Sequence, residues 1–312
     1  MISRNLLTAC LLLGVIITHA VDPVQADEAK LPLQADDLVV LRRIVEREQL
    51  TAPPEVVTNG WPLQKGDTGI RFASKDNPRH VLTVVPDARG RVVKYLGNGP
   101  ILSNASFADV AKLSELRVIR IDHNIPGPGS TTPHERYNGA GFTALEKSKL
   151  EEVRIGHAFD DKGMAALAKV ASVKFMDISH SKVTDQGLQV LKNHPSLEVF
   201  HISSQGRPER VTDKCIAVFA TLPNLKELGL HETFLTYEGG LKHLSTSKTL
   251  TMLSLKTSLV IPSDIERLKK DLPKLTVETS SPAEILESPN SRGVARWASP
   301  EAKEYLKTGE KK

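Results

Sequence analysis

The stretch VTDKCIAVFATLPNLKELGLHET, Val211–Thr233, carries the pattern that decides the fold. Its second half spaces leucines as L-x-x-L-x-L from Leu225 to Leu230, and the last of these alternate as in a strand with one buried face. Its first half has apolar residues at helical spacing, and Thr212 or Asp213 can cap that helix. One such unit is too small to bury its own apolar side, so the stretch predicts that similar units stack against it.

Units of this kind recur along the chain. The steps between their first anchors are 34, 23, 24, 28, 25 and 25 residues, which is the period of a solenoid. Stacking would bury the anchors and pair the neighbouring strands in a parallel sheet. The first anchors of the successive copies are Leu116, Leu150, Val173, Leu197, Leu225, Leu250 and Leu275.

The repeated V-T-D-x-G-L element resembles the leucine-rich repeat family, in the cysteine-containing, ribonuclease-inhibitor-like short-repeat type of exported bacterial proteins. The resemblance covers roughly 101–277 and implies a solenoid that binds protein partners on a concave strand face. We therefore expect an α/β fold: a right-handed leucine-rich repeat solenoid of about six to seven copies, with an N-terminal helix and β-hairpin cap. Asn124 matches the usual turn asparagine of the family, whereas five equivalents depart from it, so a regular asparagine ladder is not expected. These equivalents are Ala158, Ser181, Gln205, Thr233 and Ser258.

Cys215 is the only cysteine outside the first ten residues. It occupies the position held by Gly163, Gly187 and Gly239 in other copies, where a small and tightly packed residue is favoured. We therefore expect a buried, unreactive thiol that behaves as a small apolar side chain. A single cysteine also excludes an internal disulfide once the first segment is removed.

The first 26 residues have the layout of a secretory signal, because one arginine precedes an apolar run from Leu6 to Thr18 and small residues follow. Cleavage is expected after Ala26, with Ala20 as the alternative site. A membrane anchor is the other interpretation, although the run is short for a span. The prediction is an exported protein that is periplasmic, cell-surface or secreted, with no membrane span after cleavage.

Three further segments follow the signal. Residues 27–100 are predicted to form an N-terminal helix, a turn-rich linker and a hairpin around Asp87–Gly90, which together cap the first repeat. The helix stripe would be Leu38, Leu41, Ile44 and Val45. Residues 101–277 form the solenoid, and 278–312 form a polar tail rich in serine, proline and charge that we expect to be flexible.

Composition and motifs exclude several functions. The formal net charge of +4 over 312 residues is too small to indicate a nucleic-acid partner. The chain has no glycine-rich phosphate loop, no H-E-x-x-H, no C-x-x-C and no G-x-S-x-G. We therefore expect a protein without enzymatic activity and without a cofactor.

Two columns of side chains are predicted on the exposed strand face. The first column consists of the residue between the last two anchors in successive copies, which is Arg120, Arg154, Asp177 and His201. The second consists of the residue two places after the last anchor, which is His123, His157 and His180, and Asp122 lies beside His123. The three histidines can hold zinc, or can form a surface whose charge changes with pH, while the two arginines favour an acidic partner. A chance coincidence of three exposed histidines is the third interpretation.

The two longest steps place insertions directly after strands, so both loops would leave the same rim of the solenoid. Tyr137 and Arg207 lie in these loops and are residue types that anchor interfaces. The sequence thus predicts an exported protein that binds a protein partner on its strand face and rim loops. The alternative is a metal-binding or hydrolytic periplasmic protein that uses the histidine column.

Overall fold

The computed structural model describes residues 31–77, 79–99, 101–122, 137–204, 207 and 209–281, together with residues 284, 300, 304 and 308. Pro32–Lys312 form one compact unit that is separate from Met1–Leu31. The predicted signal peptide lies outside the described residues, and so does most of the predicted polar tail. No helix in the described part of the chain is long and apolar enough to cross a membrane.

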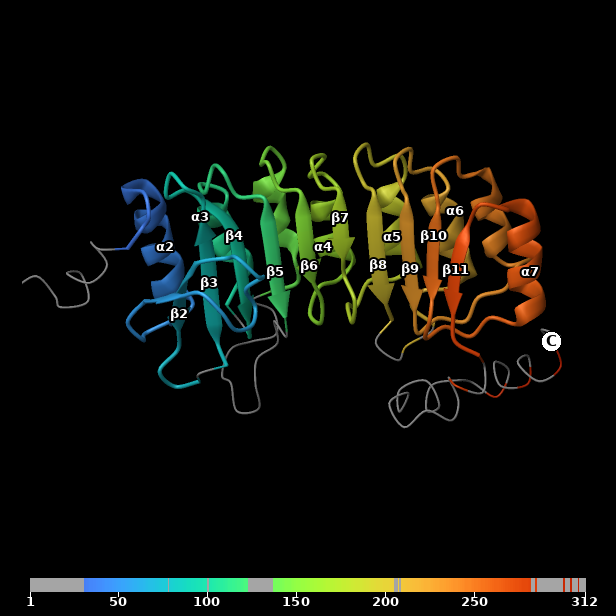
Figure 1. The fold of residues 1–312 in the computed structure, drawn as a ribbon, viewed down its shortest axis with the longest axis horizontal. Coiled ribbons are helices and arrows are strands. Elements are labelled where there is room, and N and C mark those ends of the chain that lie inside the picture. Colours follow the sequence, from blue (N-terminus) through green and yellow to red (C-terminus); the bar gives the residue numbers. More distant parts are fainter. Residues whose placement is uncertain are drawn as a thin grey trace, which may run out of the picture. The chain divides into compact units, whose positions relative to one another are not determined.

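The described residues form one sheet of 11 strands, whose order in space is their order in the chain (Figure 1). The first four strands pair antiparallel, and every pair from β4 onward is parallel. The seven strands that follow β4 match the seven predicted copies. The strands are β1 (Glu55–Val57), β2 (Gly69–Ala73), β3 (Val81–Pro86), β4 (Val92–Asn98), β5 (Val118–Asp122), β6 (Glu152–Ile155), β7 (Phe175–Asp177), β8 (Val199–Ser203), β9 (Glu227–His231), β10 (Met252–Leu255) and β11 (Thr276–Thr279).

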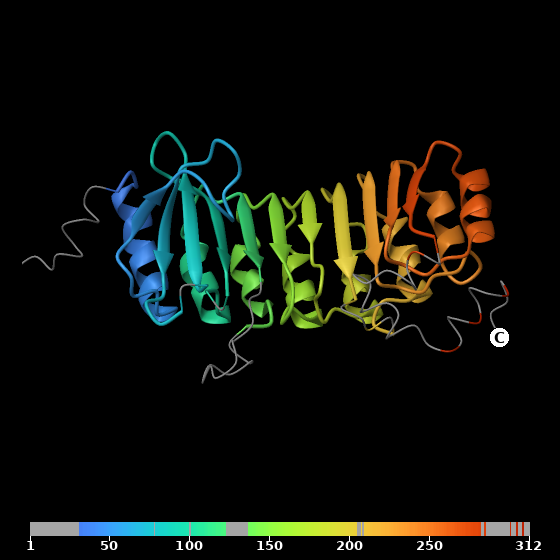
Figure 2. The ribbon, with the colours of Figure 1, turned by 60° about the horizontal axis from the view of Figure 1, so that its bottom comes forward.

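Helices pack along one face of this sheet, and in the described part of the chain the other face carries none (Figures 1 and 2). We refer to the uncovered side as the strand face. The α-helices are α2 (Ala35–Arg47), α3 (Phe107–Val110), α4 (Asp161–Leu167), α5 (Asp185–Leu188), α6 (Ile216–Phe219) and α7 (Pro262–Asp271). The 3-10 helices are η1 (Asn104–Ser106), η3 (Ala140–Leu145), η4 (Gln189–Leu191), η5 (Asp213–Cys215) and η6 (Leu241–Thr246).

The core lies between the strands and the helices. All seven first anchors are buried, and the most exposed of them, Leu250, has 7% of its surface accessible. In β9 the second and third anchors, Leu228 and Leu230, are fully buried. Burial of leucine, isoleucine and valine at fixed spacing drives the stacking that the sequence predicted. The fold is thus an α/β leucine-rich repeat solenoid.

The V-T-D element joins neighbouring copies through their side chains. The backbone N–H and the hydroxyl of Thr184 donate to Asp161 at 2.8 and 2.7 Å. Thr212 donates to Asp185 in the same way, and the next copy repeats the pair. Of the two predicted caps, the Thr212 hydroxyl accepts from Lys214 N at 3.3 Å, whereas the carboxylate of Asp213 bonds to the following copy.

Cys215 is fully buried, as predicted for the small position of the repeat. Burial raises the pKa of its thiol well above the usual value, and the negative charge of Asp185 adds to this effect. The thiol donates to the backbone oxygen of Thr212 at 3.2 Å. A protonated and buried thiol is a poor nucleophile, so the structure favours a packing role.

At two neighbouring turns, hydroxyl groups occupy the position of the family's turn asparagine. Thr233 and Ser258 are buried, and their hydroxyl oxygens lie 2.9 Å apart. The Ser258 hydroxyl also donates to Leu230 O at 2.6 Å. Small hydroxyl side chains thereby satisfy the buried backbone of these turns.

The N-terminal helix and hairpin form as predicted. Leu41 and Ile44 of α2 are buried, but Leu38 and Val45 are only half-buried, and Val40 is buried in their place. The β3–β4 hairpin is continuous with the solenoid because β4 pairs parallel with β5. The predicted linker contains the short strand β1, which was not predicted, and β2 follows it.

Polar contacts fix the helix α2 to the first copy. Arg47 at the end of α2 bonds to Asp109 at 2.8 Å. Directly after the helix, the buried carboxylate of Glu48 accepts from the backbone N–H and the hydroxyl of Ser103 at 3.0 and 2.6 Å. These bonds connect residues more than fifty positions apart, and the cap belongs to the same compact unit as the first copy.

Candidate functional site

The strand register places the residues of the predicted column side by side. Arg120 lies beside Arg154, Arg154 beside Asp177 and Asp177 beside His201. The 34-residue step between the first two copies therefore does not interrupt the stacking of β5 on β6. His201 is followed by Gly229 on β9.

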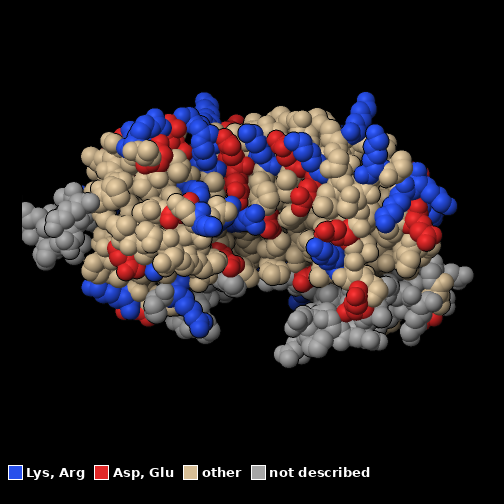
Figure 3. Space-filling view, in the orientation of Figure 1, with Lys and Arg blue, Asp and Glu red and all other residues tan. Residues whose placement is uncertain are grey.

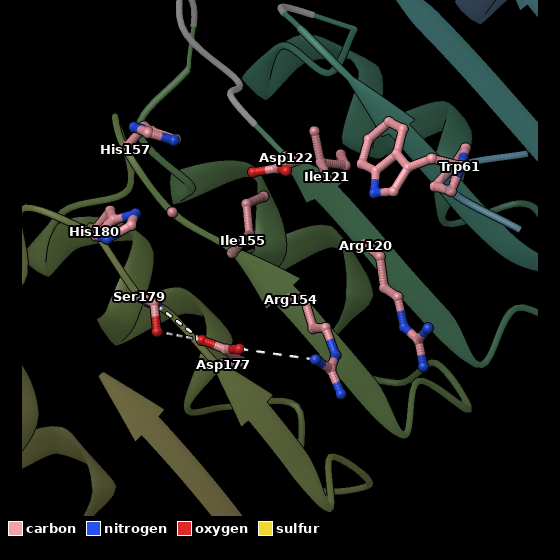
Figure 4. Close-up of a pocket in the computed structure, with 12 residues that line it drawn as sticks. Trp61, Arg120, Ile121, Asp122, Arg154, Ile155, His157, Asp177, Ser179 and His180 are labelled. Atoms are coloured by element: carbon pink, nitrogen blue, oxygen red, sulfur yellow. Dashed lines mark hydrogen bonds and ion pairs between the residues drawn. The ribbon is translucent and has the colours of Figure 1, made fainter. Parts of the chain in front are cut away.

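A pocket of about 410 Å³ opens on this face over β5, β6 and β7 (Figure 4). Six of the predicted site residues line it, which are Arg120, Asp122, Arg154, His157, Asp177 and His180. Its other lining residues are Trp61, Pro62, Ile121, Ile155, Gly156 and Ser179. Residues that are up to 119 positions apart in the chain thus meet at one hollow.

One wall of the pocket comes from the linker between β1 and β2. Trp61 is 56% exposed, and its indole stands beside Ile121 and Asp122 (Figure 4). Pro62 next to it is buried, so the loop is packed against the protein while the indole faces solvent. Trp61 was not among the predicted site residues. The N-G-W-P turn gave a signal in the form of an aromatic residue inside a polar loop.

Side chains of β4 and β5 hold this loop on the strand face. Lys94 forms an ion pair with Asp67 at 2.7 Å. The amide oxygen of Gln64, in the orientation that satisfies both ends of its amide, accepts from Nη1 and Nη2 of Arg120 at 3.0 and 3.2 Å. Arg120 therefore positions the loop that carries Trp61.

Glu152 partly neutralises the two arginines. Its Oε1 accepts from Nε of Arg120 at 2.6 Å and from Nε of Arg154 at 3.0 Å. Burial opposes ionisation of Glu152, but the hydrogen bonds from the two arginines outweigh it and lower its pKa. The guanidinium of Arg154 also lies 4.4 Å from the ring centroid of Phe175 and 3.9 Å from Asp177 Oδ2. An acidic partner would have to compete with these internal carboxylates.

Asp177 presents a fixed carboxylate at the pocket. Its Oδ1 accepts from the backbone N–H and the hydroxyl of Ser179 at 3.0 and 2.6 Å (Figure 4). Its Oδ2 faces Arg154 on the neighbouring strand. Acceptor and donor groups therefore alternate along this wall.

Two of the three predicted histidines lie together. The rings of His157 and His180 are 5.9 Å apart between centroids, and His157 N donates to His180 O at 2.9 Å. Both residues take the left-handed conformation, with φ of 57° and 59°. His123 lies outside the described residues, so a zinc site at the three histidines stays a prediction. Within the described ranges, no three metal-ligating side chains form a group that could hold an ion.

His201 belongs to a second cluster, next to the pocket. Its Nε2 lies 2.8 Å from Glu227 Oε1, and its ring meets those of Phe175 and His231 edge to face. His201 is absent from the lining of the pocket. The strand face thus continues as an aromatic and imidazole surface over β7–β9.

The two rim-loop predictions have different outcomes. Tyr137 was predicted to anchor a partner from its rim loop, and this is wrong, because it is only 5% exposed and its ring stacks on that of Phe107, with 6.4 Å between centroids. Arg207 is exposed and lies 3.8 Å from Glu209, and it does not line the pocket. The greater part of the first insertion lies outside the described residues.

A separate charge ladder runs along the edge where the strands begin. Lysine and arginine alternate with acidic residues along the upper edge of Figure 3. Glu151 pairs with Arg117 at 2.5 Å and with Lys174 at 3.6 Å, and Lys226 pairs with Glu198 at 2.6 Å. These exposed pairs neutralise one another, so this edge is weakly attractive to a charged partner.

We expect the protein to lose stability as the pH falls below about 6.5. Burial lowers the pKa of His194 and His231 from 6.5, and the charge of His201 adds to the effect at His231. Above pH 6.5 these histidines are neutral in both the folded and the unfolded chain. Below pH 6.5 they bind protons in the unfolded chain but not in the folded one. Each histidine therefore lowers the free energy of unfolding by at most about 1.4 kcal/mol for each pH unit. Urea unfolding between pH 5 and 7.5 would show this, and His194→Leu should flatten the slope. An equal slope in that variant would exclude His194 as the source.

No protein-family model matches this chain, and no curated protein matches it. Among solved structures it is similar to an internalin from Listeria monocytogenes, with 19% identity and a TM-score of 0.35 over 59% of this chain and 54% of that chain. A plant ice-binding protein has 14% identity and a TM-score of 0.43 over 80% of both chains. A leucine-rich repeat protein from Bacteroides eggerthii has 10% identity and a TM-score of 0.35 over 78% of this chain and 50% of that chain.

The chain thus spans about half the length of the internalin and of the Bacteroides protein. At these identities and TM-scores the likenesses carry no argument about ligands. The fold assignment rests on the repeated anchors, the parallel register and the one-sided helix layer. The cysteine-containing subtype stays a prediction.

Proposed function

We propose that the protein is a non-enzymatic recognition module that binds a protein partner on its strand face, centred on the pocket between the Trp61 loop and β5–β7. The observation that carries the proposal is an exposed tryptophan, 56% accessible, held by an anchored loop on one side of a pocket that Arg154 lines on the other. Tryptophan and arginine are the residue types that most often dominate interface energetics, and they do so when they are preorganised.

The rigidity of this surface supports the proposal. The strand face is built by hydrogen-bonded strands, and the loop is fixed through the Arg120–Gln64 and Lys94–Asp67 contacts. A partner that docks here would therefore lose little affinity to the ordering of the site. Beyond the pocket, Phe175, His201 and His231 offer a continuous surface on which the partner can extend.

Export is the second part of the proposal, and the apolar segment at the start of the sequence supports it. The partner would then be met in the periplasm, at the cell surface or outside the cell. The solenoid has a single buried cysteine in its described part, so it does not depend on an oxidising environment for a disulfide.

The test is a pull-down from the envelope fraction with a pocket variant and a matched control. The pocket variant is Trp61→Ala with Arg154→Glu, and the control is Val56→Ala, which alters a residue that is 53% exposed outside the pocket. A protein retained by the wild type and the control, and lost by the pocket variant, is the expected result. Identical sets of captured proteins for all three baits would refute the proposal.

A further inference from the structure

The pocket combines a flat apolar surface with hydrogen-bonding groups of both kinds. Trp61 supplies the flat surface, and it stays open to solvent although its loop is anchored. Across the pocket, Asp177 supplies carboxylate oxygens, and Arg154 and Ser179 lie next to it (Figure 4). A ligand that matches this site must have an apolar face and several polar groups around its edge.

The charge of the pocket favours an uncharged ligand. Its lining contains two guanidinium groups, of Arg120 and Arg154, and two carboxylates, of Asp122 and Asp177. A ligand with a net charge of either sign would meet a like charge within the same small volume. A hydroxyl group, in contrast, donates to a carboxylate and accepts from a guanidinium, so a ligand with several hydroxyls can satisfy both.

We infer that the Trp61 pocket binds one or two rings of a neutral saccharide. The C–H face of a sugar ring covers the indole of Trp61, and its hydroxyls bond to Asp177 and Arg154. The volume of about 410 Å³ lies in the range of small-molecule pockets. This inference goes beyond the protein recognition proposed above and does not depend on it, because a saccharide would bind without any protein attached.

The saccharide can come from two sources that share this chemistry. One is a free oligosaccharide, and the other is a glycan attached to a protein. In both cases the same ring lies on Trp61, so binding must depend on the indole and on the polar residues opposite. The two sources differ only in whether the free sugar is sufficient.

The test is calorimetric titration of the purified full chain with cellobiose, maltose, mannobiose and diacetylchitobiose. Glucuronate and glucosamine serve as singly charged controls. We expect at least one neutral disaccharide to bind with a Kd of about 0.1–5 mM. Because the ligand is neutral, we expect this Kd to change less than about twofold between low and high salt. Ribonuclease B, which carries an oligomannose glycan, and unglycosylated ribonuclease A form the protein-attached arm.

Variants connect the binding to the pocket. Trp61→Ala should weaken binding by about tenfold or more, and Asp177→Asn by a smaller factor, because an amide keeps one acceptor. Val56→Ala should bind like the wild type. The chain has two tryptophans, so Trp297→Phe leaves Trp61 as the only indole, and its fluorescence should change on titration with the sugar.

Three results would overturn the inference. The first is that neither the four disaccharides nor ribonuclease B binds more tightly than about 10 mM. The second is that only a charged control binds. The third is unchanged affinity in Trp61→Ala while circular dichroism shows a folded chain. Binding of ribonuclease B without binding of free mannobiose or ribonuclease A would instead support the inference and assign the source to a protein-attached glycan.

Discussion

Replacing Phe200 with alanine is expected to lower the free energy of unfolding by about 3–5 kcal/mol. Phe200 is the second anchor of its copy and is fully buried. In the register it lies between Met176 of β7 and Leu228 of β9, and its ring packs against Phe219 at 5.2 Å between centroids. The truncation removes contacts to two neighbouring copies and to the helix layer at once, and a tightly packed core collapses only partly around such a cavity.

The effect should be large because of where the residue lies. In a solenoid each copy is stabilised mainly by its two neighbours, so a cavity in β8 weakens both interfaces of a central copy. Urea unfolding followed by circular dichroism would measure the change. Val190→Ala is the control, since Val190 is 43% exposed and should change the stability by less than about 0.5 kcal/mol. Equal effects of the two substitutions would contradict the placement of Phe200 in the core.

The anchors of the solenoid were predictable because their signal is repeated. Seven copies place apolar residues at the same spacing, and burial of these residues is the largest favourable contribution to folding. The column from Arg120 to His201 followed from the same register, since alternate residues of a strand point to opposite faces. A pattern with a period therefore predicts both the core and the surface of the strands.

The position of the Trp61 loop on the strand face could not be predicted, because this loop lies outside the repeats and its sequence does not recur. The loop reaches the strand face through contacts between residues far apart in the chain, such as Gln64 with Arg120. Nothing in the local sequence of the loop specifies those partners. The prediction for Tyr137 was wrong for a related reason. Its place in an insertion suggested that it is exposed, whereas its ring packs against Phe107.

The threonine and aspartate that link neighbouring copies were visible in the sequence, but they were interpreted as a helix cap within a single copy. The recurring T-D pair favoured a helix cap within one copy. In the structure the Thr212 hydroxyl does cap its helix, but the aspartate carboxylates accept from the threonine one copy later, as in Asp185 with Thr212. A contact at one full period is invisible when a single copy is considered alone, although the recurrence of both residue types is what makes it possible.

Removing the carboxylate of Asp185, which links two copies in this way, is expected to have the second large effect on stability. Its carboxylate accepts from Thr212 N at 2.8 Å and from Thr212 Oγ1 at 2.6 Å, and Cys215 lies close enough for its pKa to respond to the same charge. Hydrogen bonds to a charged group contribute about 1.5–3 kcal/mol each, and their loss leaves a partly buried N–H without its acceptor. Asp185→Ala should therefore lower the free energy of unfolding by about 3 kcal/mol, which urea unfolding would measure.

A double-mutant cycle distinguishes this bond from a general effect of removing charge. Thr212→Val removes the hydroxyl but keeps the backbone N–H, so it should cost less than Asp185→Ala, and the two losses should overlap in the double variant. Asp76→Ala removes an exposed carboxylate and should change the stability by less than about 0.5 kcal/mol. Strictly additive losses at Asp185 and Thr212 would mean that the two side chains act independently, and the T-D pair would then not be what couples one copy to the next.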